Sequence, residues 1–255
     1  MNDSLIAQIR SLAPWHMDIE VAPGVRTGQV GAASAEEHGR EVSLLDPTHI
    51  RPLLSSIYPQ GLGGRRVLDV ACNSGGYCFL ACDMGADFAF GFDVREHWIR
   101  QAEFLRRCLG TSDDRVQFAQ CDLAEIDQRL ESSRFDLCLF KGIFYHLPDP
   151  VTGLKKAADM TGEILILDTA TAVDKPDGFL QLAFESAEPV MSGVHELAWL
   201  PTGPGVLKGI LKWLGFVETR LIFWNRHPGR LGRIRIVGAR SKTLLEHFDE
   251  TWEAP

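Results

Sequence analysis

The sequence lacks the features of several protein classes. No apolar run approaches the ~18–20 residues that a membrane-spanning helix needs. The first apolar stretch carries charges within it, unlike the core of a secretory signal. The six cysteines form no CxxC pair and stand in apolar segments, a pattern typical of reduced, buried thiols. We therefore exclude a membrane protein, a disulfide scaffold and a zinc ribbon, and we expect a cytoplasmic protein.

Charge is spread unevenly along the chain. The net charge is −8, yet residues 206–242 hold nine Lys or Arg residues and one acid, Glu218. The negative charge of the rest of the chain argues against a nucleic-acid binder, whereas the basic stretch could bind one ligand that carries a phosphate. The plainer interpretation, which also stays open, is that the long basic side chains flank two exposed strands.

The order of apolar and helical patterns predicts an α/β fold. From about residue 65, short apolar runs alternate with longer helical patterns, as in a parallel sheet. Strands are expected at 65–70, 88–93, 116–120, 135–141 and 163–168, with an antiparallel pair at 217–224 and 233–238. We predict an N-terminal helical or cap region (1–64), a main domain (65–240) with a cap insertion (172–204), and an acidic tail (241–255). The apolar residues of the cap predict either a lid or the contact of a homodimer.

Three acids stand at the ends of three successive predicted strands. The strand that contains Asp69 runs into a turn of small residues at 71–76, where a ligand can approach the backbone closely. Asp93 ends the second strand, where an acid suits hydrogen bonds to ribose hydroxyls. Asp122 ends the third strand and could accept a hydrogen bond from an adenine amino group. The set predicts a nucleoside site, and the alternative is that each acid caps the next helix.

Two segments carry a family resemblance. Residues 67–76 resemble motif I of the class I S-adenosylmethionine-dependent methyltransferases, and Phe140 to His146 resembles their motif IV. The resemblance covers roughly residues 60–240 and implies a Rossmann-like, seven-stranded sheet with an antiparallel last strand. Ala71 and Asn73 occupy glycine places of motif I, and we expect the loop to form because Asn tolerates unusual backbone angles. The G-x-G-x-x-G pattern of NAD enzymes is absent.

The resemblance also implies which residues bind the donor. They lie in motif I, at the following strand ends and in motif IV. The set is Asp69, Ala71, Cys72, Asn73, Gly75, Asp93, Val94, Trp98, Asp122, Leu123, Lys141 and Tyr145. Trp98 is equally well interpreted as a core residue.

A narrower likeness concerns the substrate. Residues 135–150 and 211–218 resemble the tRNA wobble-uridine carboxymethyltransferases, which use a carboxylated S-adenosylmethionine. The basic, tryptophan-rich N-terminal stretch of that family is not found here, and Arg233 or Arg235 matches its C-terminal arginine only out of register. Relatives of this shape also include enzymes that O-methylate sugars in natural-product assembly.

Methylation of a sugar hydroxyl needs a group that removes its proton. His146 follows the fourth strand, with Tyr145 beside it, and is predicted to be that base. Asp168 ends the fifth strand and is predicted to orient His146 or the acceptor, as in similar sugar methyltransferases. The alternatives are that His146 is a loop residue and that Asp168 is a helix cap.

A divalent metal is a further hypothesis. Some sugar O-methyltransferases use Mg²⁺ to lower the pKa of two adjacent hydroxyls, and Mg²⁺ prefers oxygen ligands. Asp168, His195 and Glu196 are the candidate ligands, although their spacing alone signals no metal and an exposed His-Glu pair is the simpler interpretation.

Together these patterns predict an O-methyltransferase that transfers a methyl group from S-adenosylmethionine to a small acceptor. The preferred acceptor is a sugar of a glycosylated natural product such as an antibiotic. The second hypothesis is modification of a tRNA wobble uridine, and the third is a non-catalytic protein that binds S-adenosylmethionine.

Overall fold

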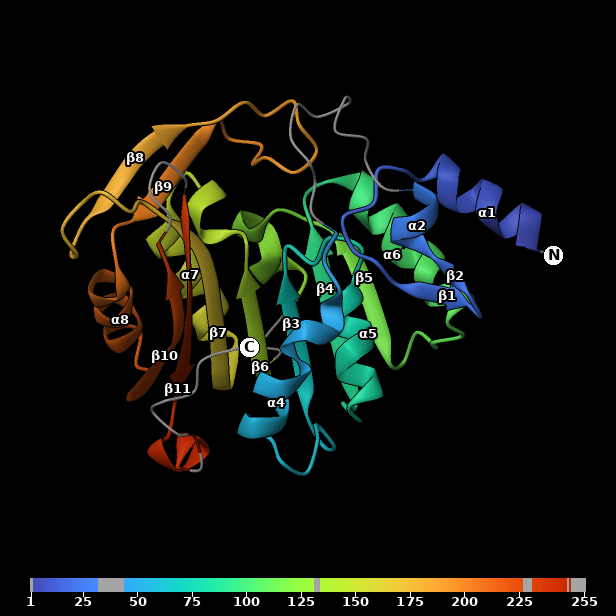
Figure 1. The fold of residues 1–255 in the computed structure, drawn as a ribbon. Helices are drawn as coiled ribbons and strands as arrows, with labels where there is room; N and C mark the ends of the chain where they lie inside the picture. Colours follow the sequence, from blue (N-terminus) through green and yellow to red (C-terminus); the bar gives the residue numbers. More distant parts are fainter. Residues whose placement is uncertain (1, 32–43, 131–133, 227–230, 247, 249–255) are drawn as a thin grey trace.

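A seven-stranded sheet forms the centre of the protein (Figure 1). The computed structural model describes residues 2–31, 44–130, 134–226, 231–246 and 248. In spatial order the sheet runs β10-β11-β7-β6-β3-β4-β5. The strands are β3 (Arg66–Val70), β4 (Phe88–Asp93), β5 (Val116–Gln120), β6 (Phe135–Lys141), β7 (Thr161–Thr171), β10 (Glu218–Asn225) and β11 (Gly232–Ala239).

The predicted topology is confirmed. β3, β4, β5, β6 and β7 pair in parallel, whereas β11, the last strand in sequence, is antiparallel to both β7 and β10. β3 pairs with β4 on one side and with β6 on the other, so the strand order reverses at β3. In open α/β sheets the crevice at such a reversal, at the carboxyl ends of the strands, is where ligands bind.

Helices cover both faces of the sheet because its central strands are apolar on both sides. Neighbouring residues of β3 illustrate this, since Val67 belongs to one buried cluster and Leu68 to the other. One face is covered by α5 (Gly76–Asp83) and α6 (Glu96–Cys108), and the other by α7 (Pro150–Asp159) and α8 (Pro204–Trp213). The short helices are η2 (Leu123–Gln128), η3 (Phe144–His146) and η4 (Lys242–Leu245). The segment that follows Asp122 is thus a 3-10 helix.

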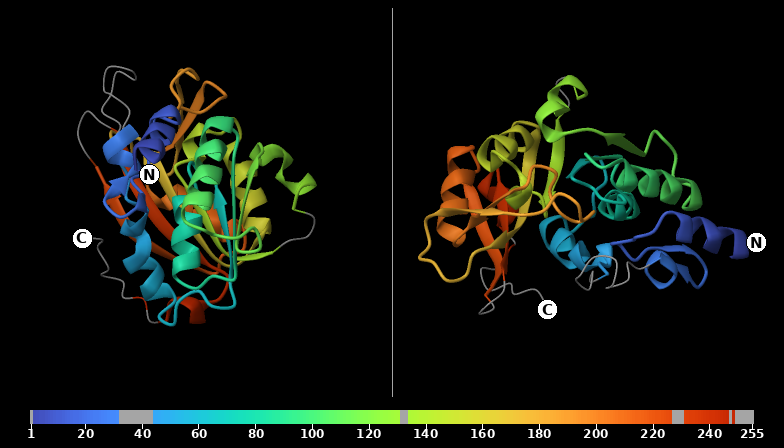
Figure 2. Two further views of the ribbon diagram at one scale, coloured as in Figure 1. Left: turned by 90° about the vertical axis from the view of Figure 1, so that its right-hand side faces the viewer. Right: turned by 90° about the horizontal axis from the view of Figure 1, so that it is seen from above.

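The N-terminal region packs on α6 and reaches the carboxyl ends of the strands. It contains α1 (Asn2–Ser11), β1 (Glu20–Ala22), β2 (Val25–Arg26), α2 (Thr27–Gly31), η1 (Pro47–Ile50) and α4 (Arg51–Ile57). Trp15 is fully buried and its ring meets Phe104 of α6, while Gln101 of α6 donates hydrogen bonds to backbone carbonyls at 12 and 14. Figure 2 shows this region, in blue, on one side of the sheet. Its attachment brings residues 16 and 17 to the crevice.

Residues 172–204 form a two-stranded antiparallel sheet with a long connection. β8 (Leu180–Phe184) pairs with β9 (Leu197–Pro201), and the segment between them runs across the carboxyl ends of the central strands, as the view from above in Figure 2 shows in orange. Trp199 of β9 donates a hydrogen bond to the carbonyl of Pro148, which ties this cap to the main sheet domain. Phe184 is 78% exposed on β8. A subunit contact through the cap stays a prediction.

The basic stretch 206–242 does not form one surface. Arg240 donates to backbone carbonyls of Ala158, Thr161 and Leu214, and Arg226 donates to the carbonyl of Val173. Arg235 is only 5% exposed. These cations therefore support the fold. The plainer interpretation placed them beside two exposed strands, whereas β11 is buried along most of its length. Among the described residues no helix is both long enough and apolar enough to cross a membrane, and most of the predicted acidic tail lies outside those residues.

The turn after β3 depends on left-handed backbone angles. Ala71, Asn73 and Gly75 have φ values of 57°, 52° and 78°. The Asn73 side chain accepts a hydrogen bond from the N–H of Ser74 at 2.7 Å, which stabilises the turn locally. Gly75 packs directly against the ring of Phe118, where a Cβ would clash. The loop thus forms as expected, although Ala71 adopts a conformation that disfavours a side chain.

We expect Ala71→Gly to stabilise the protein. A left-handed residue with a Cβ costs ~1–2 kcal/mol, and the greater freedom of glycine in the unfolded chain offsets ~0.4–1 kcal/mol of this. Urea denaturation should show a gain of about 0.5–1 kcal/mol in the free energy of unfolding. Ala157→Gly, in α7, is the matched control and should lose about 1 kcal/mol. Equal losses in both variants would show that Ala71 is not strained.

Candidate active site

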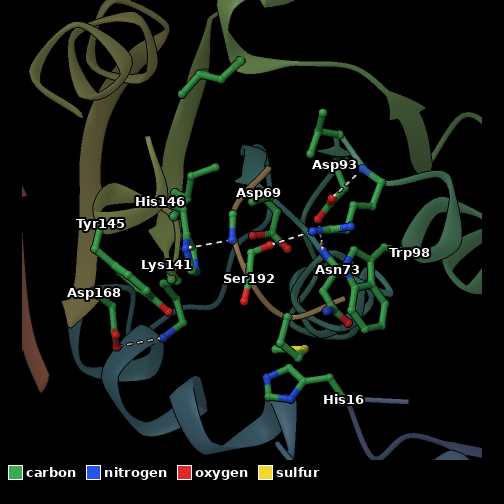
Figure 3. Close-up of a pocket in the computed structure, with 18 of the residues that line it drawn as sticks. His16, Asp69, Asn73, Asp93, Trp98, Lys141, Tyr145, His146, Asp168 and Ser192 are labelled. Carbon is green, nitrogen blue, oxygen red and sulfur yellow. Dashed lines mark hydrogen bonds and ion pairs between the residues drawn. The ribbon is translucent and has the colours of Figure 1, made fainter. Parts of the chain in front are cut away.

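A cavity of about 450 Å³ lies at the carboxyl ends of β3, β4, β6 and β7 (Figure 3). Its walls come from three parts of the chain: the strand ends of the main sheet, the N-terminal region at residues 16 and 17, and the cap at residues 190–195. The sheet therefore forms one wall of the cavity, and the N-terminal region and the cap form the other two.

Asp93 sits at the end of β4 and accepts two backbone hydrogen bonds. Its Oδ2 accepts from the N–H of Asn73 at 3.1 Å and its Oδ1 from the N–H of Arg95 at 3.0 Å. Burial raises its pKa to about 6. Val94 and Trp98 line the cavity beside it. The carboxylate is therefore fixed by the backbone and directed at the cavity, as a ribose-binding acid requires.

Asp69, in β3, is one of the unsatisfied polar groups of the cavity wall. The residue is 1% exposed, and its Oδ2 has no hydrogen-bond partner among the described residues. Burial raises its pKa to about 8. A buried carboxyl without a partner carries a desolvation cost that a ligand with N–H or O–H donors would offset.

Asp122 caps η2 and also contacts the cap. Its Oδ1 accepts from the N–H of Ala124 at 2.7 Å, so the helix-capping alternative is correct for this residue. Its Oδ2 lies 3.6 Å from Nε2 of His195. Asp122, Leu123 and His195 all line the cavity. The contact between Asp122 and His195 therefore connects the segment after β5 to the cap, beside the cavity.

Asp168, at the end of the cavity away from Asp93, is surrounded by cations. It lies 3.0 Å from Nζ of Lys141 and 2.7 Å from Nε of Arg235, and it also pairs with Arg233. Although burial opposes ionisation, these charges hold the pKa of Asp168 well below its usual range. Burial in turn lowers the pKa of Lys141 to about 8. Both oxygens of Asp168 are taken by this cluster, and among the described residues the carboxylate partner of His146 is a different one, so Asp168 does not orient His146. That Asp168 orients the acceptor stays a prediction.

The carboxylate beside His146 comes instead from the cap. Glu185 follows β8 in the chain, and its Oε1 lies 2.6 Å from Nδ1 of His146. The N–H of Gly193, also in the cap, points at the same nitrogen at 3.0 Å. The ring of Tyr145 lies 3.9 Å from the His146 ring, centroid to centroid. Nothing in the sequence linked Glu185 to His146, because the contact depends on how the cap folds back.

The end of the cavity around Asp168 and its cations, called the inner end below, also holds polar groups from the N-terminal half of the chain. Burial, with the charge of Arg233, lowers the pKa of His16 to about 4, and its Nδ1 finds no hydrogen-bond partner in the described part of the chain. The same holds for the buried hydroxyl of Tyr77. His49 lies 3.3 Å from Arg235, measured from Nε2 to Nη2. Sequence reasoning missed these residues, since a lone histidine or tyrosine carries no signal until the chain places it.

Most of the predicted site residues line this cavity, and the remainder do not. Those that do are Asp69, Ala71, Asn73, Asp93, Val94, Trp98, Asp122, Leu123, Lys141, Tyr145, His146, Asp168 and His195. Cys72 is turned toward Gly91 under the turn, and Gly75 packs on Phe118. Glu196 is exposed on the cap.

The predicted metal ligands do not converge. Asp168 is paired with three cations, His195 lies at Asp122, and Glu196 is exposed and not among the residues that line the cavity. Within the described part of the chain, no three His, Cys, Asp or Glu side chains are grouped as a metal site would require. The proposed ligand set for Mg²⁺ is therefore wrong.

Comparisons with known proteins agree with this geometry. The family described as "Methyltransferase domain" matches residues 63–196. A tRNA U34 carboxymethyltransferase of Nautilia profundicola is 33% identical over 194 residues, 75% of this chain and 55% of that protein. Its counterpart in Proteus mirabilis is 30% identical over 166 residues, 64% of this chain and 48% of that protein. The chain thus spans about half the length of the curated relatives it matches.

A solved structure matches almost the whole chain. The N-terminal domain of EvdMO1, crystallised in the presence of SAH and D-fucose, aligns with a TM-score of 0.70 and 21% identity. The alignment covers 93% of this chain and 96% of that one. The N-terminal region and the cap are therefore within the shared fold.

Proposed function

We propose a function from one premise: the chain belongs to the class I S-adenosylmethionine-dependent methyltransferases. The proposed reaction is transfer of a methyl group from S-adenosylmethionine to a hydroxyl of a small polyhydroxylated acceptor, namely a sugar. The observation that carries this proposal is that unpartnered polar groups among the described residues line the same cavity as His146, whose Nδ1 contacts the carboxylate of Glu185.

The residues around Asp69 and Asp93 fit the donor. The unpartnered Oδ2 of Asp69 suits the donor's ammonium group, and Asp93 suits the ribose hydroxyls. The apolar side chains of Val94 and Leu123 suit the adenine ring. When bound, S-adenosylmethionine supplies a methyl group on a positively charged sulfur, which is the electrophile of the reaction.

His146 supplies the base. A proton on its Nδ1, donated to Glu185 at 2.6 Å, leaves the lone pair of Nε2 free to take the acceptor's hydroxyl proton. The carboxylate fixes the ring and stabilises the positive charge that it gains. The cap segment above the cavity excludes water and holds the acceptor in place, which is the larger part of catalysis for such a displacement.

The inner polar groups suit an acceptor with several hydroxyls. His16 is neutral at pH 7 because its pKa is about 4, so its bare Nδ1 accepts a hydrogen bond. The hydroxyl of Tyr77 can donate or accept. An apolar acceptor would leave both groups buried and unpaired, which costs ~1–3 kcal/mol for each group. The D-fucose present with the EvdMO1 domain supports a sugar as the class of acceptor.

We expect donor affinity to rise with pH through the carboxyl of Asp69. A carboxyl with a pKa of about 8 must lose its proton before it pairs with the donor's ammonium. Calorimetric titration with S-adenosylhomocysteine should show tighter binding at pH 8 than at pH 6. Asp69→Asn should bind at least about tenfold more weakly at pH 8 and lose most of this slope. Asp87→Asn, on an exposed turn, is the control. Equal slopes in wild type and Asp69→Asn would contradict the role of Asp69.

We expect His146→Ala to lower turnover by roughly 10²-fold or more, because a general base contributes that much. Turnover is measured with labelled donor and a panel of sugars, and donor affinity should stay within about threefold. Glu185→Gln should lower turnover by about tenfold, since it keeps the size but loses the charge that fixes the ring. Glu188→Gln, exposed in the same cap, should leave turnover unchanged. Unchanged turnover in His146→Ala would refute this assignment of the base.

A second candidate function is favoured by the charge at the inner end. Lys141, Arg233 and Arg235 surround a single carboxylate, so this cluster carries a net positive charge. An additional carboxylate on the donor would balance it, as in the carboxymethyl transfer that the curated tRNA relatives are named for. The dispersal of the basic stretch inside the fold argues against a broad tRNA-binding face.

Mass spectrometry of the small molecules released on denaturation separates the two candidates. We expect S-adenosylmethionine or S-adenosylhomocysteine to be released from the purified protein. Release of the carboxylated donor would instead refute methyl transfer and make tRNA the acceptor to test. Arg233→Gln is the matched variant, since it should lose the carboxylated donor and retain the ordinary one.

A further inference from the structure

We propose that strand β8 of the cap pairs with β8 of a second copy of this chain, antiparallel about a two-fold axis at Leu182. The two caps then form one continuous sheet in the order β9-β8-β8-β9. The proposal goes beyond the proposed function, because no residue of β8 is assigned a part in binding or catalysis there.

One edge of β8 has backbone groups that β9 does not pair. Among the described residues β8 pairs with β9 alone. In an antiparallel pair, residues that exchange backbone hydrogen bonds alternate with residues whose N–H and C=O groups point to the opposite edge. The N–H of Thr202 donates to the carbonyl of Phe179, and the N–H of Glu185 donates to that of Glu196, so odd-numbered residues of β8 face β9. The residues whose backbone groups point outward are therefore Leu180, Leu182 and Phe184.

The side chains of the same residues make the outer face of the cap apolar. Side chains alternate between the two faces of a strand, so Leu182 and Phe184 lie on one face. Their partners on β9, on the same face, are Trp199 and Leu197. Leu182 is 44% exposed and Phe184 is 78% exposed. This face exposes on the order of 300 Å² of apolar surface, the size at which a patch on a monomer often marks an interaction site.

The sequence of β8 does not protect this edge against pairing. Residues 178–184 contain neither a charged residue nor a proline. Native proteins usually protect an edge strand with lysine, proline, a bulge or a covering segment. The pairing of β8 with β9 has no register shift, and Figure 1 shows β8 on the outer side of the cap. The edge is therefore regular, uncharged and suited to backbone pairing with another strand.

A second copy fits this edge because β8 is self-complementary. Antiparallel pairing about Leu182 places this residue opposite its own counterpart, and places Phe184 opposite the other copy's Leu180. The outward N–H and C=O groups then meet in pairs, since they recur at every second residue of both strands. In each copy β9 joins β8 to the main sheet domain, through the bond from Trp199 to Pro148, so the two main domains lie on opposite sides of the interface.

The area of the apolar face predicts a weak dimer. Stable complexes bury ~800 Å² on each partner, and the face described above is less than half of that. The backbone hydrogen bonds of the paired edges add to the association. We therefore expect a dimer near ~100 µM that dissociates to monomer near ~1 µM. A two-fold interface is complete with two copies, so larger assemblies are not expected.

Sedimentation velocity of the full-length protein, without donor or acceptor, measures this association. Leu182→Lys places two like charges opposite each other at the two-fold axis and should weaken dimerisation by at least about tenfold. Trp213→Lys is the matched control, because Trp213 is an apolar residue of α8 that is 66% exposed. It should dimerise like the wild type. Thermal melting followed by circular dichroism checks that both variants are folded.

Cross-linking tests the register of the pair in variants without added charge. The two copies of Leu182→Cys should form a disulfide on oxidation with oxidised glutathione, because their Cα atoms lie about 5.5 Å apart in such a pair. In Phe184→Cys the two thiols belong to positions four residues apart along the paired strands, about 13 Å, which a disulfide does not span. This variant and the wild type, which keeps the six native cysteines, should stay uncross-linked.

Several results would overturn the proposal. They are a monomer at ~100 µM, a dimer that Leu182→Lys leaves intact, and cross-linking of Phe184→Cys as strong as that of Leu182→Cys. Assemblies that grow beyond the dimer would also contradict it, because they require an interface that does not close. None of these measurements involves methyl transfer, so their outcome is independent of the proposed function.

Discussion

A buried carboxylate holds the two halves of the sheet in register. Asp168 of β7 lies directly opposite Lys141 of β6 on one side and Arg235 of β11 on the other, and all three side chains are buried. Charges taken out of water cost free energy unless they are paired with good geometry. A slip of either neighbouring strand by one residue would leave Asp168 or a cation unpaired, so this cluster specifies both the parallel and the antiparallel pairing. The inner end of the cavity takes its shape and its positive charge from the same contacts.

The cavity has two ends that the chain builds in different ways. The end proposed for the donor comes from successive strand–turn–helix units, as where Asp93, at the end of β4, accepts from the N–H of Arg95. The end proposed for the acceptor comes from segments far apart in sequence: the loop at His16, the cap at Glu185 and the last strand at Arg233. Under the proposed function, changes in the cap or N-terminal region therefore alter the choice of acceptor more than the binding of the donor.

This difference explains how far the sequence alone could lead. The turn at 71–76, the positions of Asp69 and Asp93 and the seven strands were predictable, because each depends on a local pattern of apolar and small residues. The partner of His146 was not, since Glu185 reaches it only after β8 and β9 have paired. The cations around Asp168 were not predictable for a similar reason. Its charge was visible in the sequence, whereas its cationic neighbours are set by strand register across three strands.

The place of β11 in the sheet has a consequence for synthesis on the ribosome. β11 is the last strand of the sheet to be translated, yet it lies between β7 and β10 rather than at an edge. A nascent chain that has emerged only through β10 has an open slot beside β7, and Asp168 then has Lys141 but neither arginine. The end of the cavity around Asp93 depends on strands that are translated early, while the end around Arg233 needs the final strand to insert. The two ends of the cavity are therefore completed at different times as the chain is synthesised.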